Sequence, residues 1–349
     1  MASGRAADDV RAAIDDAGGA VPFSTFVELA LYGPHGFYTD PTGTGSAGRR
    51  GDFLTAPEVG PLFGAVVARF LDAEWDRLDR PDPFTVVDAG AGPGTLARAV
   101  LDARPACAGA LRYVAVELST AQRSGHPADV ESTEALPDEP FSGVVLANEL
   151  LDNLPFRLAV HDGGWREAYV VVGPDGAFGE VLSAPFDPVP AVLPVAARHG
   201  ARAPLQDAGA AWVAEARRLV RRGSVVVVDY ARPSTSTLAA LDWRSWLRTY
   251  RVHHRGRHPL LDPGEQDITV DVALDQLPEP DVTCSQAEFL RRWGIDELVE
   301  AGRQAWRAAA AAPDLAAMRM RSRPTEAAAL LDPAGLGGFS VVQWIAPIG

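Results

Sequence analysis

Apolar and polar positions follow different periods along this chain, and the changes of period outline its elements. Helical spacing of apolar residues predicts helices over residues 8–17, 22–31 and 59–78. Between the second and third helices the spacing stops, and residues 32–51 form a stretch rich in glycine and proline that predicts a long loop. Loops of this length in a compact domain are usually functional. We therefore expect a lid over a binding site, although its aromatic side chains could equally belong to the core.

Short β-branched runs alternate with helical segments in the middle of the chain. Residues 84–88 predict a buried strand, the glycine-rich turn after them leads into a helix over 96–101, and further strands are predicted over 112–117 and 141–148. Strands that alternate with helices in this way are typical of a parallel sheet covered on both faces. The predicted fold class is therefore α/β.

The second half of the chain gives weaker signals. Residues 158–161 and 165–172, joined by Asp-Gly-Gly, predict a β-hairpin, and residues 224–230 predict a buried strand. The remaining predicted elements are helices over 212–220, 285–293 and 301–312 and a last strand over 339–345.

Stretches without a clear period suggest how the chain is divided. Residues 173–206 and about 231–300 are interpreted as insertions beside the sheet. We expect an N-terminal helical and lid segment, residues 1–80, followed by an α/β domain over residues 81–349 that carries these insertions.

Charge and composition exclude several classes of function. The formal net charge is −14 and all 32 basic residues are arginine, so lysine chemistry is excluded and stable binding to nucleic acid is not expected. Cys107 and Cys284 are too few for a disulfide framework or a CxxC metal site. Residues 1–20 lack the pattern of a signal peptide, and no apolar run reaches the roughly 20 residues of a membrane helix. We expect a cytoplasmic protein without metal or membrane insertion.

The turn after the strand over 84–88 carries the clearest chemical motif. Residues 88–95 read DAGAGPGT, with the acid at the strand end and Thr95 at the start of the helix. The backbone N–H groups around Gly90, Gly92 and Gly94 can receive an anion together with the helix terminus. In S-adenosylmethionine that anion is the carboxylate of the methionine end.

A dinucleotide is the rival ligand of this turn, because residues 92–97 formally satisfy G-x-G-x-x-A. Asp88 separates the two readings, since a carboxylate attracts the ammonium group of an amino acid and repels a pyrophosphate. The residues favour S-adenosylmethionine, and a purely structural glycine turn stays open as the plainer alternative.

Glu117 ends the predicted strand over 112–117 and lies 23 positions beyond Gly94. A carboxylate at this place can accept hydrogen bonds from both ribose hydroxyls of a nucleoside cofactor. The alternative is an ordinary solvated carboxylate at a strand end.

Asn148, Glu149 and Asp152 follow the predicted strand over 141–148, at the edge where parallel sheets bind ligands. Asn148 offers both a donor and an acceptor, and the two acids, three positions apart, can share one face of a short helix. Such a pair suits a cationic or amine acceptor. The alternative is a pair of acids that only complement a helix dipole.

These segments together resemble the MidA-like family of S-adenosylmethionine-dependent methyltransferases. The segments that carry the resemblance extend over nearly the whole chain and include FSTFVELALY (23–32), GDFLTAPE (51–58), the turn at 88–95, ANELLDNLP (147–155) and PGEQDIT (263–269). The resemblance implies a Rossmann-like class I methyltransferase sheet with S-adenosylmethionine as cofactor. It also implies a protein substrate with arginine as the preferred acceptor, as in mitochondrial members that assist assembly of respiratory complex I.

The resemblance also implies site residues. Those expected to bind the cofactor are Asp88, Gly90, Gly92, Gly94, Thr95, Glu117, Leu118, Gly51, Asp52, Phe53, Thr55 and Asn148. Asn148, Glu149 and Asp152 are expected to be catalytic. The chain departs from the family pattern at Asp88, where Glu is usual, and at Leu150, Leu151 and Asn153. A small-molecule acceptor and a non-catalytic assembly factor that binds the cofactor remain alternatives, and we also consider a homodimer.

Overall fold

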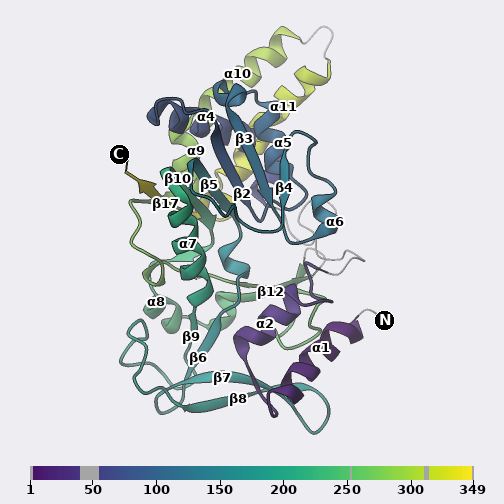
Figure 1. Cartoon of the computed structure of the whole chain (residues 1–349), viewed down its shortest axis with the longest axis vertical. Helices are drawn as coiled ribbons and strands as arrows, with labels where there is room; N and C mark the ends of the chain where they lie inside the picture. Colours follow the sequence, from purple (N-terminus) through teal and green to yellow (C-terminus); the bar gives the residue numbers. More distant parts are fainter. Residues whose placement is uncertain (1–2, 40–54, 252–253, 310–313, 348–349) are drawn as a thin grey trace.

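A seven-stranded sheet forms the centre of the upper half of the molecule (Figure 1). The computed structural model describes residues 3–39, 55–251, 254–309 and 314–347. In spatial order the strands are β16 (Val282–Ser285), β17 (Ser340–Ala346), β10 (Val220–Asp229), β5 (Phe141–Asn148), β2 (Phe84–Ala89), β3 (Leu111–Val116) and β4 (Glu131–Thr133). β10, β5, β2, β3 and β4 pair in parallel, and β17 pairs antiparallel with β10.

The strand order reverses at β2. β3 and β4 lie on one side of it, and β5 and β10 lie on the other. A crevice at such a reversal, outside the carboxyl ends of the strands, is where open α/β sheets bind their ligands. β2 is buried at every position because both faces of the sheet are covered, which explains why its sequence does not alternate between apolar and solvent-exposed polar residues.

Alternate residues of the strands face two different layers of helices. Val86 and Val144 belong to the core cluster on one face, and Val87 and Val145 belong to the cluster on the other face. The first face is covered by α4 (Pro61–Arg77), α5 (Thr95–Asp102), α9 (Gln286–Arg292), α10 (Ile295–Ala308) and α11 (Leu315–Leu330), and the second by α7 (Asp207–Leu219). Full burial of a valine side chain stabilises the fold by roughly 1.5–3 kcal/mol, so the paired clusters hold the sheet rigid beneath its ligand edge.

A second, five-stranded sheet lies in the lower half of the molecule (Figure 1). Its strands are β1 (Val21–Pro22), β7 (Trp165–Val172), β6 (Arg157–His161), β9 (Arg202–Leu205) and β8 (Phe178–Pro185). The predicted hairpin of β6 and β7 is confirmed. α1 (Ser3–Asp16) and α2 (Phe23–Tyr32) share a core cluster with this sheet and with β12 (Leu247–Arg251) and β14 (Asp267–Val270). β12 pairs with β14 and with β13 (His254–Arg255).

The remaining elements are short. They are α3 (Ala56–Val59), α6 (Thr120–Arg123), α8 (Thr235–Ala240), β11 (Ala231–Arg232), β15 (Val272–Ala273), and the 3-10 turns η1 (Ala106–Gly109), η2 (Leu151–Asn153), η3 (Trp243–Ser245), η4 (Leu274–Gln276) and η5 (Leu336–Gly338).

The segments that had no clear period acquire structure from tertiary pairing. Residues 173–206 contain β8 and β9, which pair with β7 and β6. The range 231–300 contributes β12 to β14 below the main sheet, but it also contains β16 and α9, which belong to the main sheet and its helices. The first 80 residues likewise serve both halves, since α4 packs against α5 whereas α1 and α2 pack on the second sheet.

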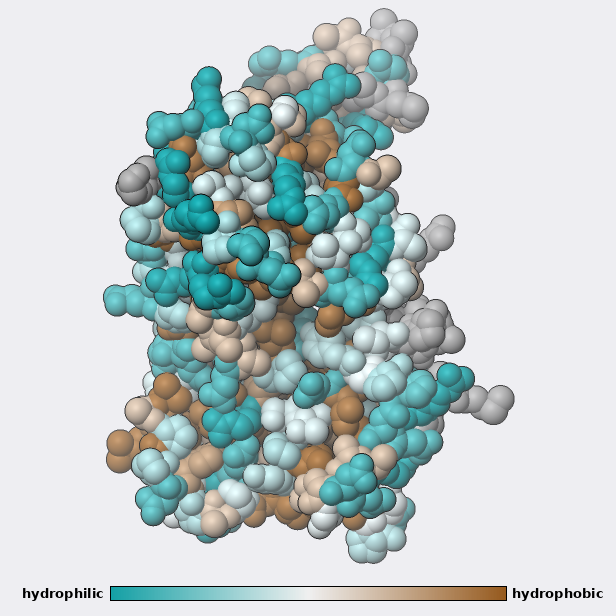
Figure 2. All heavy atoms as spheres, viewed as in Figure 1, coloured by the Kyte–Doolittle hydropathy of each residue, from teal (hydrophilic) through white to brown (hydrophobic). Residues whose placement is uncertain are grey.

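Within the part of the chain that the structure describes, no helix combines the length and apolar character needed to cross a bilayer. On the face seen in Figure 2, hydrophilic side chains cover most of the surface over the main sheet and its helices, and apolar side chains show through more in the lower half.

Candidate active site

A cavity of about 510 Å³ opens at the carboxyl ends of β2, β3 and β5, within the roughly 300–1,000 Å³ typical of small-molecule sites. Its walls are the glycine-rich turn after β2, the residues that follow β3, β4 and β5, the end of α2 with the turn after it, the segment around α3, and one face of α7. The structure therefore brings the predicted motifs together at the reversal of the strand order.

The turn after β2 approaches the cavity with its backbone. Gly92 has a φ of 53°, and a Cβ atom there would lie 3.2 Å from Oε1 of Gln122. Gly90 has a φ of 73°, and its Cβ would lie 3.2 Å from Cδ1 of Leu150. Both conformations are strained for residues other than glycine. Gly94, with a φ of 75°, precedes Thr95, where α5 begins, so a ligand can approach the backbone and the helix start closely.

Asp88 lines the cavity from β2 and is only 2% exposed. Burial raises the pKa of this carboxyl group to about 7, while a hydrogen bond from Tyr113 lowers the pKa and the charge of Glu117 raises it. At neutral pH the carboxyl group is therefore only partly ionised, and a neighbouring cation would lower its pKa and favour the carboxylate form. This behaviour fits a site for the ammonium group of an amino acid.

Glu117 joins the end of β3 to the glycine-rich turn. Its Oε2 atom accepts a hydrogen bond of 3.0 Å from the N–H of Gly92, and its Oε1 atom accepts one of 2.8 Å from the N–H of Ser119. Each carboxylate oxygen keeps a further lone pair. The side chain is thus fixed in place with acceptor capacity to spare, and the predicted contact with the ribose hydroxyls stays a prediction.

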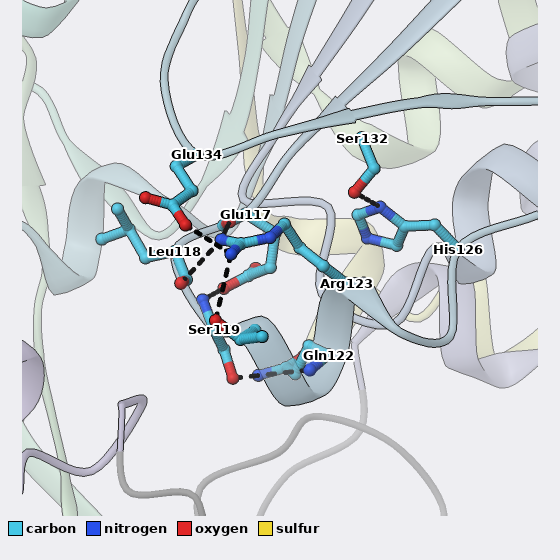
Figure 3. Close-up of polar contacts among 9 residues, drawn as sticks. Glu117, Leu118, Ser119, Gln122, Arg123, His126, Ser132 and Glu134 are labelled. Atoms are coloured by element: carbon cyan, nitrogen blue, oxygen red, sulfur yellow. Dashed lines mark hydrogen bonds and ion pairs between the residues drawn. The ribbon is translucent and has the colours of Figure 1, made fainter.

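Arg123 lies beside Glu117 and contacts the residues that follow β3, as Figure 3 shows. From α6 it donates hydrogen bonds of 2.7 and 2.9 Å to the carbonyl oxygens of Glu117 and Leu118, and it pairs with Glu134. Leu118 is 54% exposed and lines the cavity. Arg123 carries no motif signal and was not predicted.

Asn148 and Glu149 line the cavity at the end of β5. Oε1 of Glu149 accepts hydrogen bonds from Nδ2 of Asn148 at 3.0 Å and from the N–H of Ala56 at 3.4 Å. Burial, followed by the charge of Asp229, raises the pKa of Glu149 to about 8. The Oδ1 atom of Asn148 is buried without a hydrogen-bond partner among the described residues, so it can accept one from a ligand.

Asp152 does not lie where the sequence placed it. Glu149 has a φ of 54°, and only the single 3-10 turn η2 follows it. The expected helical face shared by Glu149 and Asp152 is therefore wrong, because a left-handed residue interrupts the helix. Asp152 is 2% exposed and stands outside the cavity wall. Burial, followed by the charges of Asp229 and Asp267, raises its pKa.

The segment before α4 closes part of the cavity. Thr55 and Glu58 line it, and Oγ1 of Thr95 donates a hydrogen bond of 2.6 Å to Glu58. Gly51, Asp52 and Phe53 lie outside the described residues, so their contacts with the cofactor stay a prediction. Tyr32 and Tyr38 of the predicted lid also line the cavity.

The acidic residues that line the cavity favour S-adenosylmethionine over a dinucleotide. Of the described residues that line the cavity, six are acidic and none is basic; the acids are Glu58, Asp88, Glu117, Glu134, Glu149 and Glu215. Such a wall repels the pyrophosphate of a dinucleotide and attracts the ammonium and sulfonium groups of S-adenosylmethionine. The contacts of the glycine-rich turn with its carboxylate and of Glu117 with its ribose stay predictions.

Comparisons with known proteins agree with this fit. A family model of S-adenosyl-L-methionine-dependent methyltransferases matches residues 66–290. A solved structure from Burkholderia thailandensis, with S-adenosyl-homocysteine bound, is 30% identical with a TM-score of 0.82, over 99% of this chain and 92% of that chain. A second Burkholderia thailandensis structure is 29% identical with a TM-score of 0.80, and covers 99% of this chain and 92% of that chain.

Curated relatives are mitochondrial proteins. The protein arginine methyltransferase NDUFAF7 homolog of Drosophila melanogaster is 30% identical over 73% of this chain and 65% of its own length. The Mus musculus protein arginine methyltransferase NDUFAF7 is 25% identical over 71% of this chain and also 65% of its own length. The chain thus spans about 65% of these relatives. By its sequence, its sheet order and its site, the chain belongs to the MidA-like family of S-adenosylmethionine-dependent methyltransferases, with a class I methyltransferase fold and S-adenosylmethionine as its cofactor.

Proposed function

We propose that this protein is a methyltransferase that transfers a methyl group to a side-chain nitrogen of arginine in a protein substrate. The observation that carries the proposal is the paired Asn148 and Glu149 at the end of β5, in a cavity wall with six acids and no basic residue among those described. The names of the curated relatives, which are protein arginine methyltransferases, support the same acceptor.

The cofactor, when bound, supplies a methyl group on a positively charged sulfur atom. The chain itself has to position a nitrogen in line with that methyl group, because correct orientation of two reacting groups can lower the barrier by about 7–11 kcal/mol. The Oδ1 atom of Asn148, buried and without a described partner, can accept a hydrogen bond from one N–H of the guanidinium. The carboxylate of Glu149 can accept a second one and so fixes the plane of the group.

Transfer to a guanidinium group releases one proton, since both the acceptor and the methylated product carry a single positive charge. Glu149, with its pKa raised to about 8, is a stronger base than an ordinary glutamate. We assign it the uptake of this proton. Asp152 does not line the cavity, so we assign it no contact with the acceptor.

The experiment is transfer of isotopically labelled methyl groups into a lysate. Label in the protein fraction, recovered as methylarginine after acid hydrolysis, is the expected result. Label in another amino acid would replace arginine as the acceptor, and label in the small-molecule fraction would establish a metabolite acceptor. Binding of S-adenosylhomocysteine without any transfer would favour a non-catalytic protein.

A further inference from the structure

Two tyrosines from the N-terminal segment stand at the β5 end of the cavity. Tyr32 ends α2, Tyr38 lies in the turn that follows, and both line the cavity. The hydroxyl of Tyr32 donates to the carbonyl oxygen of Asn153, and that of Tyr38 donates to its Oδ1 atom, each at 3.3 Å. Asn153 comes four positions after Glu149 and also lines the cavity.

The two rings form a stacked pair. Their centroids are 5.6 Å apart and their planes differ by 20°. The one hydroxyl proton of Tyr38 is shared between Asn153 and Asp267, and the contact with Asp267 is the shorter at 2.9 Å. Asp267 also accepts a hydrogen bond of 3.0 Å from Nδ2 of Asn153. Because the hydroxyls are engaged by protein groups, the aromatic carbons are what the pair offers to a ligand in the cavity.

The surroundings of the pair are negatively charged. Burial, followed by the charge of Asp267, raises the pKa of both tyrosines well above the usual value, so both rings stay neutral. Neutral aromatic rings among carboxylates favour a flat, weakly hydrated cation, which stacks on the rings while its N–H groups reach the acids. Guanidinium has this shape and charge.

The pair is anchored to different parts of the chain from the groups that we expect to hold the cofactor. Asp88, Gly92 and Glu117 belong to the turn after β2 and the end of β3. Among the described residues, the hydroxyl groups of Tyr32 and Tyr38 donate to Asn153, which follows β5, and to Asp267 of β14. Loss of a ring should therefore affect the acceptor and spare the cofactor.

We infer that Tyr32 and Tyr38 form the aromatic wall of the acceptor subsite and select a guanidinium group. The inference rests on the proposed transfer to arginine and adds the residues that recognise the acceptor. Neither tyrosine takes part in the proton transfer assigned to Glu149.

The test is binding of ethylguanidinium to the complex of the protein with S-adenosylhomocysteine, with uncharged ethylurea as the comparison ligand. Wild-type protein should bind ethylguanidinium and bind ethylurea at least tenfold more weakly. Tyr32→Leu and Tyr38→Leu should each weaken ethylguanidinium binding about three- to thirtyfold and leave S-adenosylhomocysteine affinity within about twofold. Tyr32→Phe and Tyr38→Phe keep the rings and should stay within about threefold of wild type. Tyr169→Leu on β7, away from the cavity, is the matched control.

A second measurement covers leucine variants that fail to fold. Ethylguanidinium should perturb the tyrosine absorbance of the wild-type complex, and the double variant Tyr32→Phe with Tyr38→Phe should lose that signal. Leucine variants that fold and bind like wild type would overturn the inference, as would equal binding of ethylguanidinium and ethylurea. The labelling experiment tests the proposed function separately. If no methylarginine forms but ethylguanidinium binding still requires the two rings, the proposed function fails and the inference about the tyrosine pair stands.

Discussion

The hydroxyl of Tyr113 on β3 donates a hydrogen bond of 3.0 Å to Oδ2 of Asp88 on the neighbouring strand β2, and both side chains are buried. Asp88 faces the cavity, so this bond sets the charge of the cofactor site. Burial raises the pKa of Asp88 to about 7, and the bond from Tyr113 opposes the rise. We therefore expect cofactor binding to depend on pH near neutrality.

Cofactor affinity should increase from pH 6 to pH 8. The ammonium group favours ionised Asp88, so binding below pH 7 has to release a proton from the carboxyl group. Calorimetry of S-adenosylhomocysteine binding in buffers with different ionisation enthalpies measures both the affinity and the number of protons released. Asp88→Asn should bind about ten- to a hundredfold more weakly at pH 8 and lose the pH dependence.

Tyr113→Phe tests the same prediction by shifting the pKa of Asp88 without removing its carboxyl group. Removing its hydrogen bond should raise the pKa of Asp88 further and move the increase in affinity to higher pH. Affinity that is independent of pH in the wild-type protein would contradict the role of Asp88.

The turn after β2 should tolerate little change. Gly92→Val forces a branched side chain onto a φ of 53° and toward Gln122, so we expect loss of measurable S-adenosylhomocysteine binding. Glu117→Ala removes the acceptor of two backbone N–H groups as well as the ribose contacts. We expect its affinity to fall by roughly 1.5–3 kcal/mol. Glu139→Ala, an exposed acid outside the cavity, controls for charge.

Methyl transfer should require the ionised carboxylate of Glu149. Its pKa of about 8 predicts that kcat/KM of the free enzyme rises with pH through that value. Glu149→Gln should bind S-adenosylhomocysteine within a few fold of wild type, lose transfer about a hundredfold or more, and lose this pH dependence.

Asp152→Asn should retain more transfer than Glu149→Gln, because Asp152 stands outside the cavity wall. Rates of transfer into the protein fraction compare the two variants directly. Equal losses in both would place Asp152 in contact with the acceptor, and a parallel loss of cofactor affinity in Glu149→Gln would reassign Glu149 to the nucleoside.

The cofactor half of the site could be predicted because its signals are local. The β-branched run of β2, the glycine-rich turn and the start of α5 are continuous in sequence, and parallel strands end at a common edge. Asp88, Glu117 and Asn148 therefore meet as expected. The fold class follows from the same alternation of strands and helices, which the sheet order confirms.

The acceptor half depends on contacts that periodicity does not reveal. The bond from Tyr32 to Asn153 joins residues 121 positions apart, so only tertiary packing places the tyrosine pair beside the end of β5. The positive φ of Glu149 is equally hidden, because a helical pattern of acids gives no sign of a left-handed residue. β8 and β9 likewise form through pairing with β7 and β6 and not through a strong pattern of their own.

The buried carboxyl groups should make the ligand-free protein less stable as the pH rises. Asp88 and Asp229 have pKa values raised to about 7 and Glu149 to about 8, with burial as the largest cause in each. These groups bind protons more tightly in the folded than in the unfolded chain. Proton binding by these groups therefore stabilises the folded state fully below the ordinary carboxyl pKa of about 4, and this stabilisation is lost as the pH rises to about 8.

The free energy of unfolding by urea should consequently fall between pH 5.5 and pH 8.5, by about 1.4 kcal/mol per pH unit for each proton of difference. This range stays above the ordinary pKa of about 4 of exposed carboxyl groups, so their protonation does not contribute to the slope. Glu149→Gln should flatten the slope, because it removes one of the groups that lose a proton. S-adenosylhomocysteine should flatten it as well, because its ammonium group stabilises ionised Asp88. Stability that rises over the same range would show that the buried carboxyls are already ionised in the folded protein.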